Sequence, residues 1–141
     1  MRHYIPSWEA IGIKKERYLE LLHFCRQYPD WKTEVASLVG PFGVKLDGMP
    51  HGSTPGDPVA SAAERRERLI AKIDLVDRCA AAVDRGRWYA AIIQNVCMMR
   101  PYASIAPSVL PTSDRNSFFK ARKAFFILLN KSKGGEDDNH I

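Results

Sequence analysis

A stretch rich in glycine and proline divides the chain and limits where regular structure can form. Residues 40–58, GPFGVKLDGMPHGSTPGDP, contain five glycines and four prolines. Both residue types destabilise helix and strand interiors, so this stretch predicts an irregular linker. It is longer than most loops of compact domains. Regular structure is therefore expected only on either side of it.

The 39 residues before the linker predict two helices. Apolar side chains recur at helical spacing between about Lys14 and Gln27. Pro29 interrupts this pattern, and Asp30 can cap a second, shorter helix. We interpret residues 1–39 as a pair of N-terminal helices.

The longest helical pattern follows the linker, over residues 59–85. Its inward positions are spaced alternately by four and three residues, which is a heptad seam. A dimeric coiled coil and a helical hairpin or bundle both fit this seam, and we favour packing within one chain because the first helix needs a partner. The run ERRER at 64–68 alternates in sign and predicts a solvated face. The seam consists of Ala62, Arg66, Leu69, Ile73, Val76, Ala80 and Val83.

Residues 86–133 predict a helix-turn-helix-like module, which completes an all-α fold. A helix over about 87–99 has one apolar side, formed by Trp88, Ile92, Val96 and Met99. In a helix-turn-helix the last helix enters the major groove of DNA, and the order of elements here is the same.

The last helix of this module is expected to start near Ser113. A short helical turn at 102–106 and two prolines precede it, and Asp114 places an acid at the positive end of its dipole. Paired glycines end it, and residues 134–141 form an acidic tail that we expect to be disordered.

The positive charge of the chain is concentrated in this last part. The formal net charge is +5, and residues 88–135 carry seven basic side chains against one acidic side chain, Asp114. Local asymmetry of this kind is typical of a surface that binds a polyanion. It is also compatible with a basic face that only contacts solvent.

At 100° per residue, the last helix separates into a core arc and a basic arc. Phe118, Ala121, Phe125 and Leu128 share the core arc. Asn116, Lys120 and Lys123 share the opposite, basic arc, and Arg115 and Arg122 lie between the two arcs. The apolar side chains Phe119, Phe126 and Ile127 point away from it, which would favour a protein contact. Arginine suits guanine, asparagine suits adenine and lysine commonly contacts phosphate. The predicted DNA-binding residues are Ser113, Arg115, Asn116, Lys120, Arg122 and Lys123.

The sequence shows no pattern typical of an enzyme, a metal-binding protein or a membrane protein. The four histidines are scattered, so no catalytic constellation, metal site or cofactor is expected. Cys25, Cys79 and Cys97 form no C-x-x-C pair and are interpreted as reduced core residues. No apolar run is long enough to span a bilayer and no export signal is recognisable, so we expect a cytoplasmic, non-enzymatic protein.

Two strings, YPDWKTEVASL and DGMPHGSTPGDPVASAAERRERLIAKIDLVDRC, resemble phage-encoded regulators of the RinA/ArpU type. The resemblance covers about residues 18–130. It implies a terminal helix-turn-helix similar to region 4 of sigma factors, in which Tyr102 precedes a short turn formed by Ile105 and Ala106. It also implies control of phage or prophage transcription. The proline-rich turn APSVLPTS departs from the family pattern.

Two functional hypotheses follow. The first is a regulator that binds double-stranded DNA, with contact to RNA polymerase and homodimerisation left open. The second is a phage-encoded interaction module or inhibitor that binds a host nucleoprotein or polymerase. Arg115 and Asn116 would contact the partner in the first case, and Phe119, Phe126 and Ile127 in the second.

Overall fold

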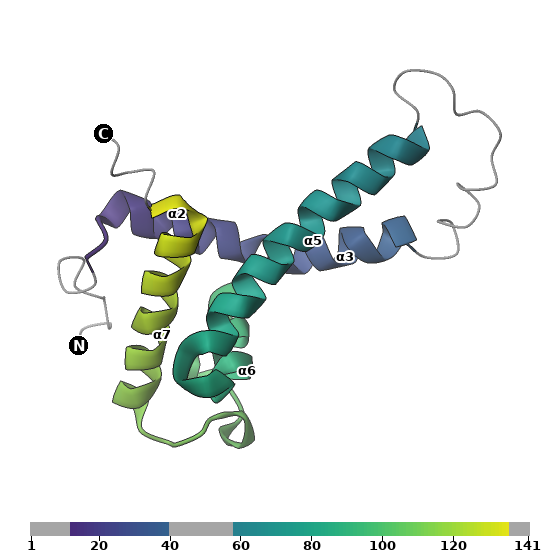
Figure 1. Cartoon of the computed structure of the whole chain (residues 1–141). Helices are drawn as coiled ribbons and strands as arrows, with labels where there is room; N and C mark the ends of the chain where they lie inside the picture. The colour runs from purple at the N-terminus through teal and green to yellow at the C-terminus, as the bar shows by residue number, and fades with distance from the viewer. Residues whose placement is uncertain (1–11, 40–57, 136–141) are drawn as a thin grey trace. The chain divides into compact units, whose positions relative to one another are not determined.

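A computed structural model describes residues 12–39 and 58–135, and the regular elements in both ranges are all helical (Figure 1). The predicted all-α class is confirmed for these residues. Most of the predicted linker and residues 136–141 of the predicted tail lie outside the described residues. The chain divides into a smaller unit, Tyr28–Asp74, and a larger unit, Met1–Gln27 with Leu75–Ile141.

The smaller unit contains α3 (Tyr28–Val39) and the first part of α5 (Pro58–Ala82). Both helices begin earlier than predicted, because each includes a proline in its first turn. Proline is tolerated there, since the N–H that it lacks would have no partner within the helix. Trp31 and Leu69 are buried. The ammonium of Lys72 lies 5.7 Å from the centre of the Trp31 ring.

The seam of α5 faces inward, as predicted. Leu69, Val76, Ala80 and Val83 are buried, and the other three seam residues are half-buried. The helix ends at Ala82 rather than Arg85, and a 3-10 turn, η1 (Val83–Gly86), follows. It ends there because Asp84, Arg85 and Gly86 have φ of 47°, 59° and 85°, outside the right-handed helical region.

The larger unit is built around α2 (Lys15–Arg26) and α7 (Arg115–Asn130). Helix α7 packs against α2, η1 and α6 (Tyr89–Ile92), and α2 packs against a π-helical turn, η2 (Ile93–Cys97). Figure 1 shows the last turns of α7 meeting α2. Two 3-10 turns, η3 (Tyr102–Ser104) and η4 (Pro107–Val109), connect η2 to α7, and η5 (Lys131–Gly135) follows it.

The predicted single helix over 87–99 is wrong in its second half. Trp88, Ile92 and Val96 are buried as expected, but Met99 is 61% exposed. The backbone passes from α6 into the π-turn η2, which has more residues per turn, and Met99 then adopts φ 58°. The four-and-three spacing that placed Met99 in the core therefore stops before that residue.

Candidate nucleic-acid interface

The first turn of α7 is fixed by side chains that precede it. The Asp114 N–H donates to Oγ1 of Thr112 at 2.8 Å. The Asp114 carboxylate accepts from the N–H of Asn116 at 3.3 Å and from the Ser117 hydroxyl at 2.7 Å. These contacts lower the pKa of Asp114, and the Ser117 hydroxyl contributes most. The predicted start near Ser113 is therefore two residues early, and Asp114 is the cap.

One face of α7 forms part of the core of the larger unit. Phe118 and Phe125 are fully buried and Ala121 is 6% exposed, as predicted. Leu129 is fully buried where Leu128 was expected, and Leu128 is only half-buried. The buried line 118, 121, 125, 129 keeps the spacing of three and four residues that a packed helix requires.

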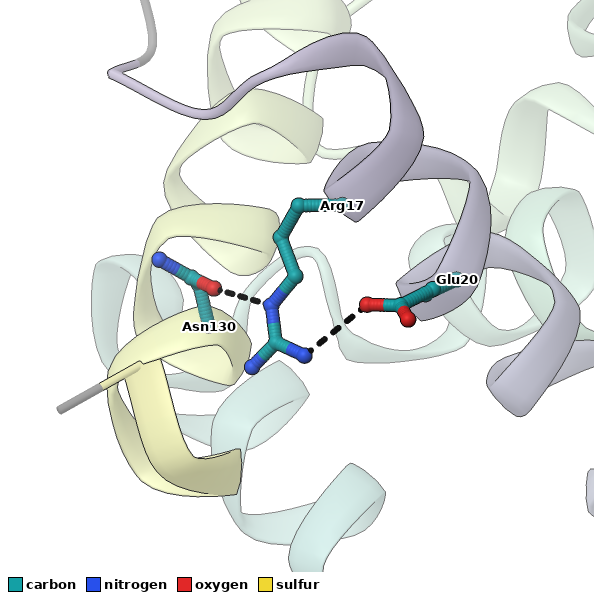
Figure 2. Close-up of polar contacts among 3 residues, drawn as sticks. All are labelled: Arg17, Glu20 and Asn130. Carbon is teal, nitrogen blue, oxygen red and sulfur yellow. Dashed lines mark hydrogen bonds and ion pairs between the residues drawn. The ribbon is translucent and has the colours of Figure 1, made fainter. Parts of the chain in front are cut away.

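A second face of α7 packs against α2. Arg122, Phe126 and Asn130 are spaced by four residues and share this side of the helix. The ring of Phe126 lies 4.8 Å from that of Tyr18. Figure 2 shows the Arg17 side chain between Asn130 and Glu20, and its Nε donates to Oδ1 of Asn130 at 2.7 Å.

The prediction that Phe126 is exposed is therefore wrong. Phe126 is 1% exposed, because two neighbours cover α7 and the buried arc is wider than one core-facing stripe. Phe119 is half-buried rather than exposed, since its ring lies 4.9 Å from Phe118 and 6.0 Å from Tyr102. Of the three apolar side chains expected on the surface, only Ile127 is exposed.

Arg122 joins three elements of the larger unit. Its Nε donates to Oδ1 of Asn95 in η2 at 2.8 Å, and its Nη1 donates to the hydroxyl of Tyr18 in α2 at 2.8 Å. Its guanidinium carbon lies 5.1 Å from the centre of the Phe126 ring. The structure thus directs this predicted DNA-binding side chain toward partners within the protein.

The remaining face of α7 is basic and lies at the surface. Asn116 and Lys120 are exposed and Lys123 is half-buried, and Lys131 continues the line into η5. We call these four residues, together with Ile127, the lysine stripe. It contains three lysines and no acidic residue.

Arg115 and Ser113 lie beside the lysine stripe at the start of α7. The guanidinium of Arg115 is 5.1 Å from the Tyr102 ring centre and 5.2 Å from that of Phe119, and the side chain is exposed. Ser113 is exposed, and its carbonyl oxygen accepts from the Tyr102 hydroxyl at 3.3 Å. Ring contacts of this kind hold an arginine in place while its N–H edge faces solvent.

A cleft lies between η1 and the first turns of α7. Its volume is about 400 Å³, and Asp84, Arg87, Lys120 and the two hydroxyl residues Thr112 and Ser117 line it. Arg87 was not among the predicted DNA-binding residues, because it lies just outside the basic segment 88–135 and far from the last helix in the sequence. Only the neighbouring Gly86 indicated that the chain turns at this point.

The connection between the two helical segments is longer than in a tight helix-turn-helix. Residues 98–114 separate η2 from α7, and η3 and η4 occupy part of this distance. The helical segment formed by α6 and η2 precedes the basic helix α7, which is the predicted order. The short turn that defines a helix-turn-helix is replaced by the 3-10 turns η3 and η4.

The described residues contain no arrangement of three or more His, Cys, Asp or Glu that could hold a metal. Cys25, Cys79 and Cys97 are buried, as predicted, and none of them forms a disulfide in the structure. A hydrogen bond with Cys97 and burial raise the pKa of the Cys25 thiol, and burial raises that of Cys79. Such thiols are poor nucleophiles. None of the described helices could cross a bilayer.

Comparison with known proteins returns no similarity: neither a family model, nor a curated protein, nor a solved structure matches the chain.

Proposed function

We propose that this protein binds double-stranded DNA through the lysine stripe of α7. The observation that carries the proposal is the separation of α7 into three faces. Two faces are fixed by the core and by α2, and the third presents Lys120, Lys123 and Lys131 on a stripe that contains no acidic residue. A rigid helix with one cationic face is the element that many proteins insert into the major groove.

The burial of Phe126 and the partial burial of Phe119 favour DNA over a protein partner. The alternative of an interaction module depended on three apolar side chains at the surface, but Phe126 is buried and Phe119 is half-buried. Ile127 alone is too small an apolar surface for a docking site. A nucleic-acid partner needs no apolar patch, because cationic contacts to phosphate supply most of its affinity.

Within this proposal the site residues have different roles. Lys120, Lys123 and Lys131 contact phosphates, while Asn116 and the ring-supported Arg115 reach base edges. Arg122, with its internal partners, positions α7 instead of contacting DNA. The resemblance to RinA/ArpU regulators makes transcriptional control in a phage or prophage the setting of the proposal.

The salt dependence of DNA binding tests the proposal. The slope of log affinity against log salt is negative for a protein that contacts phosphates. We expect Lys120→Ala and Lys123→Ala each to reduce the magnitude of this slope by about 0.9, because each variant loses one phosphate contact. Fluorescence anisotropy on a labelled random duplex measures the slope. Lys15→Ala, an exposed lysine of α2, is the control with the same charge change.

The role of Asn116 requires a selected duplex. Sites enriched from a randomised library should lose about 1–3 kcal/mol of binding free energy with Asn116→Ala, while random duplexes lose little. If the Lys120→Ala, Lys123→Ala and Lys131→Ala triple variant binds duplex as tightly as the parent, α7 is not the DNA-binding element.

A further inference from the structure

The cleft between η1 and α7 brings together two cations that lie far apart in the sequence. Arg87 follows η1, and Lys120 lies in the second turn of α7. Trp88, Ala121 and Ala124 add apolar surface to the same cleft. A cationic cleft with an apolar wall matches a sugar-phosphate unit, whose phosphate is anionic and whose deoxyribose is largely apolar.

The turn that carries Arg87 has a backbone conformation that ordinary residues avoid. Asp84 and Arg85, neither of them glycine, have φ of 47° and 59°. Left-handed conformations in non-glycine residues occur preferentially where the surrounding structure fixes them, and they concentrate at functional sites. Here they end α5 abruptly and bring Arg87 beside α7.

Asp84 holds this cationic side of the cleft in place. Its Oδ2 accepts from Nη1 of Arg87 at 2.9 Å and from the indole N–H of Trp88 at 3.2 Å. The ion pair is at the surface, with side chains 54% and 44% exposed, so its contribution to stability is small. The guanidinium has further N–H donors that this single pair does not use.

We propose that the cleft binds a backbone phosphate of the DNA, held between Arg87 and Lys120, with the Thr112 hydroxyl as an additional donor. The inference rests on the proposed function and extends the DNA-binding surface from α7 onto η1. Arg87 then fixes the register of α7 on the duplex, because phosphate contacts position a protein on DNA.

Asp84→Asn gives the sharpest test. The carboxylate of Asp84 repels a phosphate in the cleft, and asparagine removes this negative charge while keeping the shape of the side chain. Asparagine tolerates the left-handed φ and keeps an acceptor for Arg87 and Trp88. We expect duplex binding to tighten by roughly three- to tenfold at low salt. Glu16→Gln, which removes an exposed acid of α2 outside the cleft, should leave the affinity unchanged.

A second variant tests the cation. Arg87→Gln should reduce the magnitude of the slope of log affinity against log salt by about 0.9. Arg26→Gln, on the exposed surface of α2, should not change this slope. Thermal melting of each variant shows that it is folded. If Arg87→Gln and Asp84→Asn behave like their controls while Lys120→Ala weakens binding, the cleft proposal is overturned and the role of α7 stands. If Lys120→Ala also has no effect, the proposed function itself fails.

Discussion

Among single residues, Arg122 connects three elements of the larger unit. Its guanidinium donates to Asn95 and Tyr18 and lies over the Phe126 ring, so it links η2, α2 and α7. Asn95 in turn donates to the carbonyl oxygen of Arg100 at 3.0 Å, which extends the network into the segment after η2. Planar guanidinium groups suit such sites because their donors have fixed directions.

Removal of Arg122 should therefore destabilise the protein. We expect Arg122→Ala to lower the free energy of unfolding by about 2–4 kcal/mol, since two hydrogen bonds to a charged group and their packing are lost. Arg122→Lys should restore only part of this loss, because an ammonium cannot reproduce both donor directions. Urea denaturation measures the difference. A loss as small as that of Lys120→Ala would place Arg122 among the surface residues.

The sequence could not reveal this role for Arg122. Its position next to Lys123 in a basic helix indicated a surface cation, and helical angle placed it between the two arcs. Its partner Tyr18 lies 104 positions earlier in the chain. By contrast, Asn116 and Lys120 were predicted to be exposed and are exposed, because local periodicity alone decides on which side of α7 they lie.

At the scale of elements, the cap of α7 and the turn η1 determine where the candidate interface begins. The sequence predicted a sharp start for α7 because Thr, Ser and Asp cluster before it. It did not predict η1 in detail, since Asp84 and Arg85 are not residues that a left-handed turn requires. The π-turn η2 was also missed, because no local pattern distinguishes it from α-helix.

The cap predicts a specific response to acid. The pKa of Asp114 lies below its ordinary value, so its stabilising effect on α7 is full above that ordinary value and is lost as pH falls through the lowered pKa. Ser117→Ala removes the largest cause and should raise the Asp114 pKa toward the ordinary range. Carboxyl chemical shifts during an NMR titration measure it, with Ser108→Ala as the control. An unchanged Asp114 pKa would contradict the assigned cap.

At the scale of the molecule, the larger unit buries the last part of the α5 seam within one chain. Val76 and Ala80 are completely buried and Val83 is 5% exposed. Heptad spacing alone left a dimeric coiled coil open, because the pattern shows that a stripe is covered but not what covers it. Packing of α7 against η1, at the end of α5, supplies part of the cover.

This burial predicts that folding does not depend on self-association. The midpoint of thermal unfolding should be the same at about 1 µM and about 100 µM protein, because mass action shifts a midpoint only when subunits associate. Differential scanning calorimetry at both concentrations checks this. A midpoint that rises with concentration would mean that a second copy stabilises the fold.

The division of α7 into faces also determines how this protein can diverge. Substitutions at Phe118, Phe125 or Phe126 remove buried rings and are eliminated through loss of folding. Substitutions at Asn116, Lys120 or Lys123 leave those faces intact, so they alter what the helix meets with little effect on the scaffold. Related chains should therefore preserve the two packed faces of α7 and vary freely on the third, and a library randomised at three positions could give the same fold a new target.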